Sequence, residues 1–304
     1  MITTLAGGVG AAKLLMGLTR VMKPEDLTAI VNTGDDIQLH GLHISPDLDI
    51  AAYTLAGMVD EEKGWGIRGD TFHCLDGLRR LTGSEWFNLG DGDLATHIFR
   101  TNCLRSGATL TEVTVEITRA LGVKTRILPM TDDRFETRIV TKGGTMHFEE
   151  YMVKRGAKDE VLGVELFGAD KANPAPGVVE AIEEAERVVV CPSNPVVSIG
   201  TILAVKGIRG ALKRTKAQKV AVSPIIAGVP VKGPADKLLR GLGREVSAFG
   251  VAELYGDFLD TFIIDYADAD EKERIERLGV EVKVTNTLMR SLEDKVRLAR
   301  VVLE

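Results

Sequence analysis

The stretch Ile2–Leu18, ITTLAGGVGAAKLLMGL, joins a short apolar segment, a group of glycines and a segment with apolar residues at helical spacing. This order favours a strand over Ile2–Ala6, then a turn and a helix. Gly8 and Gly10 would allow a tight turn and bring backbone N–H groups close to an anion at the helix N-terminus. No G-K-[S/T] closes the loop as in a Walker A motif, and Lys13 stands where a dinucleotide fingerprint has its third glycine. A glycine turn that only lets the strand and the helix pack therefore stays an open alternative.

Strand-like apolar runs recur along the chain, each near a helical pattern. They are LTAIVNT, RVVVCPS, KVAVSPI, TFIID and VEVKV, which begin at Leu27, Arg187, Lys219, Thr261 and Val280. Continuous apolar strands that alternate with helices predict an α/β protein with a Rossmann-like core, in which a mostly parallel sheet is covered on both faces. We predict one domain over residues 1–304, with a mixed α+β insertion over about 49–167 that forms a cap over the active site. Within the insertion, helical patterns come first, and the short β-like runs TRIVT, TMHFEEYMV and VLGVELF follow.

Composition excludes several classes of protein. The chain has 304 residues, 44% of them hydrophobic, and a net charge of -6, with its Lys and Arg residues scattered. Phosphate neutralisation needs clustered cations, so we expect no nucleic-acid partner. The sequence shows no signal-peptide pattern and no apolar run near the ~20 residues of a spanning helix. We therefore predict that the protein binds no membrane. Cys74, Cys103 and Cys191 lie far apart, which excludes a disulfide framework and fits a cytoplasmic protein.

Carboxylates follow the second predicted strand in NTGDD, where Asp35 and Asp36 lie, and in SPDLD, where Asp47 and Asp49 lie. Asp35 comes 25 positions after Gly10, roughly where a dinucleotide enzyme has its ribose-binding acid, so a nicotinamide oxidoreductase stays an alternative. Several carboxylates suit Mg²⁺ better than one ribose contact, because hard cations prefer several oxygen ligands. The alternative is that Asp47 or Asp49 caps the helix expected near residue 50. The pattern H-x-x-H at 40–43 is typical of ordinary polar positions.

The loop after the strongest apolar run, CPSNPVVSIGTIL, has two prolines, Pro192 and Pro195, that fix the backbone. Ser193 and Asn194 between them offer hydrogen bonds, and a helix opens near Ser198. Because ligands bind beyond the carboxyl ends of parallel strands, we predict that a nucleotide binds between this loop and the first glycine loop. The proline-rich loop at 222–239 would either form one wall of a pocket or only pack against the rest of the protein.

Eight motifs together resemble the 2-phospho-L-lactate transferase family, the enzymes that finish the core of the deazaflavin coenzyme F-420. They are AGGVGAAKLL, VNTGDD, SPDLD, RGDTF, LGDGDLATH, LPMTDD, PSNPVVSIG and SPIIAG, and they span Gly7 to about Asp260. The resemblance implies transfer of a phospholactyl or phosphoenolpyruvyl group from lactyl-2-diphospho-5'-guanosine to the ribityl hydroxyl of the deazaflavin FO (7,8-didemethyl-8-hydroxy-5-deazariboflavin), with release of GMP. It also implies dependence on Mg²⁺ and a homodimer.

The resemblance places Asp49 at the position that contacts FO, and Asn88 where the family often has Lys or Arg. We expect Asp35, Asp36 and Asp49 to hold the magnesium ion and to be the catalytic residues. Arg68, Arg100 or Lys13 would compensate for the charge that Asn88 lacks. The predicted substrate-binding residues are Asp49, Asn88, Gly8, Val9, Gly10, Lys13, Thr33, Ser193, Asn194 and Pro195.

Two other functions stay open at this stage. One is a non-enzymatic relative of the same family that binds a nucleotide sugar and regulates cell-envelope growth, against which the segments SPDLD and LGDGDLATH argue. The other is an NAD-dependent oxidoreductase, which rests only on the first glycine loop and Asp35. One double bond separates the lactyl from the enolpyruvyl donor, and the sequence does not distinguish them.

Overall fold

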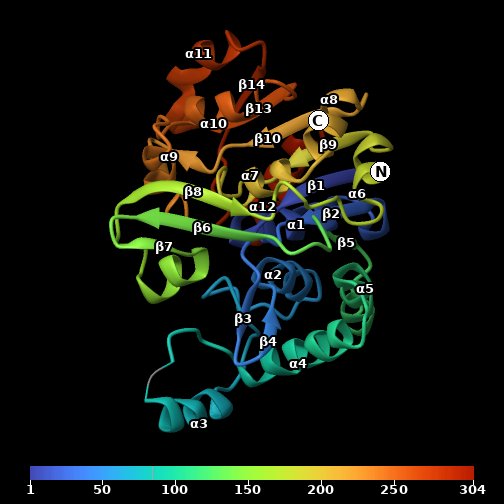
Figure 1. Ribbon diagram of the computed structural model, residues 1–304. Helices are drawn as coiled ribbons and strands as arrows, with labels where there is room; N and C mark the ends of the chain where they lie inside the picture. The colour runs from blue at the N-terminus through green and yellow to red at the C-terminus, as the bar shows by residue number, and fades with distance from the viewer. Residues whose placement is uncertain (84) are drawn as a thin grey trace.

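Seven strands within residues 1–83 and 85–304, the part of the chain that the computed structural model describes, form one parallel sheet (Figure 1). Its order is β14-β13-β10-β9-β1-β2-β5. The strands are β1 (Ile2–Ala6), β2 (Leu27–Val31), β5 (Arg126–Pro129), β9 (Arg187–Val190), β10 (Gln218–Val222), β13 (Thr261–Asp265) and β14 (Glu281–Thr285). The order reverses between β1 and β9, which is the Rossmann-like arrangement predicted from the apolar runs.

Helices cover both faces of the sheet, because alternate strand residues point to opposite sides. On one face, Val31 and Val189 lie in the same apolar cluster as Leu14 and Leu298. The helices of this face are α1 (Gly8–Val21), α2 (Pro46–Leu55) and α12 (Leu292–Leu303). The other face packs against α6 (Val178–Glu183), α7 (Ile199–Ala204), α8 (Ile208–Arg214), α9 (Ala235–Gly241), α10 (Ala248–Tyr255) and α11 (Lys272–Glu276). Burial on both faces explains why the strand sequences are apolar throughout.

Smaller elements surround this core. Figure 1 shows α3 and α4 at the lower end of the molecule, away from the central sheet, and β6 and β8 across its front. The helices of this part are α3 (His73–Thr82), α4 (Asp91–Arg105) and α5 (Leu110–Ala120). The antiparallel strands are β3 (Ile37–Leu39) with β4 (Leu42–Ile44), β7 (Gly144–His147) with β6 (Glu136–Thr141) and β8 (Val161–Phe167), and β11 (Ile225–Ile226) with β12 (Val229–Pro230). Short helical turns occur at η1 (Pro24–Asp26), η2 (Glu150–Lys154) and η3 (Tyr266–Glu271).

The segment 49–167, predicted as one insertion, is not separate from the core. β5 lies within it and pairs with β2 at the edge of the central sheet, and α2 packs against α1. The run TMHFEEYMV is a strand only to His147 and then forms the π-helical turn η2. That the rest of the segment is a cap over an active site stays a prediction. Among the described residues, no helix is both long enough and apolar enough to span a bilayer.

The loops after β1 and β9 meet at the point where the strand order reverses. The Gly7 N–H donates to Ser193 Oγ at 3.2 Å, and Gly8 has a φ of 69°, a value that favours glycine. A Cβ atom at Gly10 would overlap the carbonyl oxygen of Pro192. Glycine is therefore needed at position 10 for packing between the two loops, whatever ligand they bind.

We expect Gly10→Ala to lower the free energy of unfolding by about 1–3 kcal/mol, because the added methyl group must push the Pro192 backbone away. Gly77→Ala in α3 is the matched control, since a Cβ there meets no atom within 4 Å. That variant should gain about 0.5–1 kcal/mol from helix propensity. Urea unfolding of both variants checks this; a Gly10→Ala protein as stable as the wild type would show that the two loops are not in contact.

Candidate active site

The side chain of Asn32 links the elements that meet at the candidate site. Asn32 follows β2 and is fully buried. Its Nδ2 donates to Asp35 Oδ2 at 3.0 Å and to Asp47 Oδ2 at 2.9 Å. Its Oδ1 accepts from the Gly34 N–H at 2.8 Å and from Thr201 Oγ1 at 2.6 Å. The amide therefore uses its full hydrogen-bonding capacity, and it holds α2, α7 and the loop after β2 together.

Asp47 caps a helix, but not the one predicted. It lies in the first turn of α2, yet its Oδ1 accepts from the N–H of Gly8 at the start of α1, at 2.8 Å. A carboxylate at this place stabilises the N-terminus of α1. Burial raises the pKa of Asp47 to about 6, although Asn32 and Gly8 act in the opposite direction. The Gly8 N–H, predicted to bind a substrate anion, is thus already used by Asp47, whereas helix geometry leaves the N–H groups of Val9 and Gly10 without intrahelical acceptors.

Carboxylates gather around Asp35. Burial raises the pKa of Asp35 well above its usual value, Asp47, Glu149 and Asp36 add to the effect, and the neighbouring Thr137 hydroxyl acts in the opposite direction. Burial also raises the pKa of Glu149 to about 8, with Asp47 and Asp36 contributing. Asp35 Oδ1 and Asp36 Oδ1 are buried and have no hydrogen-bond partner among the described residues. Buried oxygens of this kind fit a hard cation.

These carboxylates are not arranged as a ready-made metal site. Within residues 1–83 and 85–304, no three Asp, Glu, His or Cys side chains form a group that could hold a metal ion. Glu149 was not among the predicted site residues. Glu149 lies near Asp35 because it follows β7 in the folded chain, and no local sequence pattern predicts this position.

Asp36 is fixed by the loop that precedes α2. Its Oδ2 accepts from Ser45 Oγ at 2.7 Å and lies 2.9 Å from His43 Nε2. The other ring nitrogen of His43 is 2.9 Å from Gln38 Nε2. Because that amide nitrogen can only donate, His43 Nδ1 accepts and Nε2 donates to Asp36. His43 thus orients a carboxylate.

Asp49 is neutralised by a buried arginine, which the predicted metal site did not foresee. Both Asp49 oxygens accept from the guanidinium of Arg100, one of them at 3.1 Å from Nη1. Asp49 is 6% exposed and Arg100 is 2% exposed. His97 Nδ1 lies 3.6 Å from Asp49, and burial lowers the pKa of His97 to about 4, so this imidazole is neutral at pH 7. Asp49 is therefore the acid least suited to bind Mg²⁺ among the three predicted.

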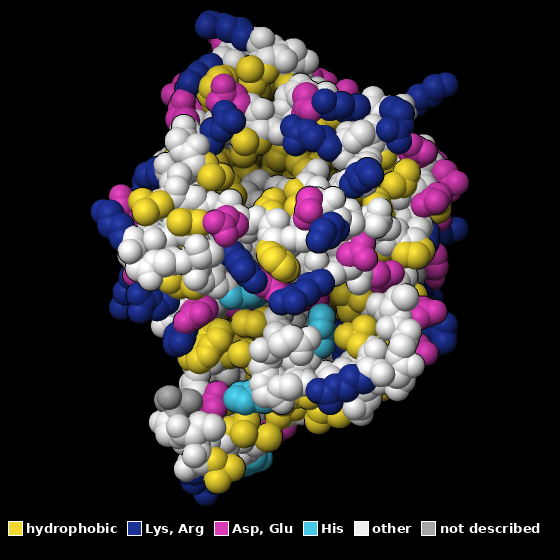
Figure 2. Space-filling view, in the orientation of Figure 1, with side chains coloured by type: hydrophobic (Ala, Val, Ile, Leu, Met, Phe, Trp, Pro, Cys, Tyr) yellow, Lys and Arg dark blue, Asp and Glu magenta, His cyan; other side chains and the backbone are white. Residues whose placement is uncertain are grey.

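The other predicted residues on the loops after β2 and β9 are Thr33, Ser193, Asn194 and Pro195. Ser193 is buried and accepts the Gly7 N–H, and the Thr33 hydroxyl is buried with no partner among the described residues. Asn194 Oδ1 accepts the N–H groups of Val196 and Val197, at 3.0 and 3.3 Å. That contact shapes the turn and leaves only the amide nitrogen of Asn194 for a ligand. Pro195 borders a cavity of about 240 Å³ with Gly200 and residues of α7 and α10; Figure 2 shows a hollow with hydrophobic walls over these helices.

Asn88 interacts with α3. It is exposed, and its Oδ1 accepts from Arg79 Nη2 of α3 at 3.1 Å. Arg68 donates to the backbone carbonyl of Gly57. In the described part of the chain, neither residue forms a hydrogen bond or ion pair with Asp35, Asp49 or the glycine loop, so a role for Asn88 in substrate binding stays a prediction.

The strand order and the two loops at its reversal define a Rossmann-like α/β protein with a site at the carboxyl ends of the strands. Residues 2–300 match the family model for "2-phospho-L-lactate transferase CofD". The chain is 44% identical to the 2-phospho-L-lactate transferase of Methanosarcina mazei, with 98% of each chain covered. It is also 44% identical to the phosphoenolpyruvate transferase of Streptomyces coelicolor, with 99% of this chain and 97% of the relative covered.

The chain belongs to the 2-phospho-L-lactate transferase family, which is consistent with coenzyme F-420 biosynthesis, and it is a transferase. A solved structure of a UPF0052 family protein from Bacillus halodurans has the same fold, with a TM-score of 0.68, 17% identity, and 100% of this chain and 98% of that chain covered. The family that the eight motifs predicted is thereby confirmed. Asp35 is buried among carboxylates, which gives no support to a ribose contact in an oxidoreductase.

We expect Asp49→Asn to lower the free energy of unfolding by about 3–5 kcal/mol, because it leaves the buried Arg100 without a countercharge. The control is Asp76→Asn, which breaks an ion pair with Arg79 on the surface and should cost at most about 1 kcal/mol. Denaturant unfolding measures both. An Asp49→Asn protein of wild-type stability would mean that Arg100 has another partner in solution.

Proposed function

We propose that this enzyme moves a phospholactyl or phosphoenolpyruvyl group from the guanosine diphosphate-linked donor to the ribityl hydroxyl of FO. The observation that carries the proposal is the meeting of the loops after β1 and β9 beside a group of buried carboxylates with two unpartnered oxygens. In the reaction, the ribityl oxygen forms a bond to the phosphorus that carries the lactyl or enolpyruvyl group. The bond from that phosphorus to GMP breaks, and the hydroxyl proton is released.

The crevice between the two loops suits the donor. The N–H groups of Val9 and Gly10 are available to phosphate oxygens at the start of α1. The cavity of about 240 Å³ that borders Pro195 of the second loop is otherwise lined by residues of α7, α8 and α10, and it has room for part of a ring system. Thr33, which follows β2, has an unpartnered hydroxyl. Since phosphoryl transfer depends mainly on positioning and charge stabilisation, such groups account for much of the catalysis.

Magnesium fits the residues present. Asp35 and Asp36 would hold it, because each has a buried carboxylate oxygen without a partner, and Glu149 and Asp47 lie near enough to raise the pKa of Asp35. A bound Mg²⁺ supplies positive charge for the phosphates of the donor. His43 and Ser45 hold Asp36 in place, and Asn32 holds Asp35. We assign Asp49 to the structure around this site, through Arg100.

The test is mass spectrometry of the product from FO with each donor, with and without a chelator. We expect the modified FO and free GMP to form only when Mg²⁺ is present. We also expect kcat to fall about 100-fold or more for Asp35→Asn and for Asp36→Asn. Asp76→Asn, an exposed carboxylate on α3, should retain full activity. No product with either donor would refute the transfer, and undiminished product in chelator would refute the metal.

We further propose a cytoplasmic homodimer. Ile98 and Phe99 of α4 and Val115 of α5 are 48%, 42% and 39% exposed, and a second chain would cover apolar surface of this kind. Light scattering should give twice the chain mass of 32.9 kDa; a mass of one chain would contradict the dimer.

The described cysteines Cys74, Cys103 and Cys191 are free thiols, which suits the reducing cytoplasm. Cell fractionation that placed the protein in an oxidising compartment would contradict that part.

A further inference from the structure

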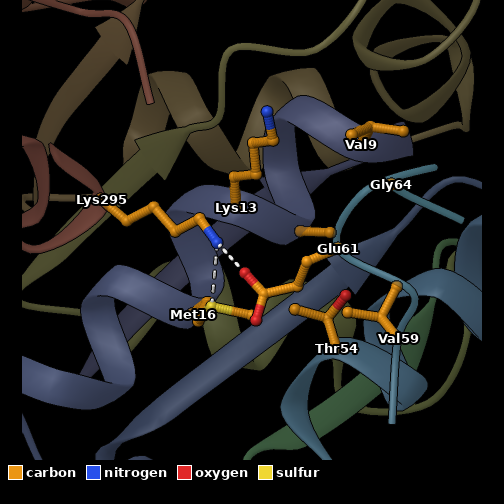
Figure 3. A pocket seen from close by; sticks show the side chains of 9 residues that line it. Val9, Lys13, Met16, Thr54, Val59, Glu61, Gly64 and Lys295 are labelled. Atoms are coloured by element: carbon orange, nitrogen blue, oxygen red, sulfur yellow. Dashed lines mark hydrogen bonds and ion pairs between the residues drawn. The ribbon is translucent and has the colours of Figure 1, made fainter. Parts of the chain in front are cut away.

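A small pocket beside the first turns of α1 is lined by more lysines than acidic residues. Val9, Lys13 and Met16 line it from α1, Glu61 and Gly64 from the loop after α2, and Lys295 from α12 (Figure 3). Its volume is about 20 Å³, room for a water-sized group but not for a nucleobase or a deazaflavin ring. A ligand could therefore place only a single small group here.

Three lysines gather around this pocket, and one carboxylate pairs with them. Lys295 is 4% exposed and donates to Glu61 Oε2 at 2.7 Å. Lys13 has no hydrogen-bond or ion-pair partner among residues 1–83 and 85–304; Figure 3 shows its ammonium group pointing away from Glu61. Within the same described residues, Lys232 donates only to the backbone carbonyl of Lys63, at 3.2 Å. Two cations near the start of α1 are thus left without a carboxylate.

Lys13 and Lys232 lie close enough to affect each other. A Cβ atom at Gly64 would lie 3.1 Å from Lys232 Nζ and 3.1 Å from Val9 Cγ1, which places Lys232 beside the first turn of α1. Burial lowers the pKa of Lys13, and Lys295 adds to this, while Glu61 acts in the opposite direction. Burial also lowers the pKa of Lys232, followed by the charge of Lys13. Cations that repel one another without a countercharge are stabilised by an anionic ligand.

We propose that Lys13 and Lys232 form a binding site for one oxyanion of the donor, at the mouth of this pocket beside Val9. This rests on the proposed function, in which the donor carries a diphosphate and a carboxylate. Asp47 already takes the N–H of Gly8, so fewer backbone donors remain for the donor at the start of α1, and the lysines supply the positive charge that those N–H groups lack. Glu61 pairs with Lys295, whereas neither Lys13 nor Lys232 forms an ion pair within the described part of the chain, so both ammonium groups can bind a ligand.

The experiment is calorimetric titration of GDP and of the complete guanosine diphosphate-linked donor, without FO. The proteins are the wild type, Lys13→Gln, Lys232→Gln and the control Lys63→Gln, whose exposed ammonium pairs with Asp60 in the same loop as Glu61. Loss of one charge-assisted hydrogen bond should raise Kd about tenfold or more. Lys63→Gln should leave both dissociation constants unchanged. If Lys13→Gln failed to fold, the exposed Lys232 would carry the test.

The two titrations separate the two sources of the oxyanion. If Kd rises for GDP and for the donor, the lysines bind the diphosphate. If Kd rises for the donor alone, they bind the carboxylate of the transferred group. Dissociation constants within twofold of the wild type for both ligands and both variants would overturn the proposal, as would a wild-type protein that binds neither ligand. Because no titration needs turnover, absence of transfer to FO would refute the proposed function and leave this site standing.

Discussion

The hydrogen bonds of one buried amide, Asn32, determine how the site is built. A neutral side chain that donates to two carboxylates at once lets Asp35 and Asp47 lie close together without an intervening cation. The same amide accepts from Thr201 of α7, and Asp47 in turn caps α1. Helices from both faces of the sheet are thereby attached to the end of β2. An unsatisfied group in this network would cost more than the network gains from any single bond.

Charge is separated around the first turn of α1. Asp35, Asp47 and Glu149 lie near the Asn32 network, and Lys13 and Lys232 lie near Val9 and Gly64. Within the described chain, no member of either group forms an ion pair with a side chain of opposite charge. A ligand that carries both a metal ion and several oxyanions would complement both groups together, and a nucleoside diphosphate with Mg²⁺ has this composition. The site therefore combines features that a cation or an anion alone would not explain.

Sequence patterns predicted the strands well and the charged contacts poorly. TFIID forms β13 over the residues expected, because a strand buried on both faces must be apolar throughout. β5 was assigned to the insertion, since RILP is short and lies between helical and β-like patterns. The pairing of Asp49 with Arg100 spans 51 positions, and Glu149 approaches Asp35 only through tertiary structure. No local pattern reports such a countercharge, so the nearest acids in the sequence were grouped instead.

The crevice is formed by the loops after β1 and β9, which lie far apart in the sequence. The bond between Gly7 and Ser193 closes a separation of 186 positions, and β9 joins β1 on the side away from β2. During synthesis on the ribosome, β1, β2 and β5 emerge well before β9 can take its place. Parallel pairing at such separation is slow, because much chain entropy is lost before the contact forms. In a nascent chain the crevice between the loops after β1 and β9 therefore forms late, after β1, β2 and β5 have been synthesised.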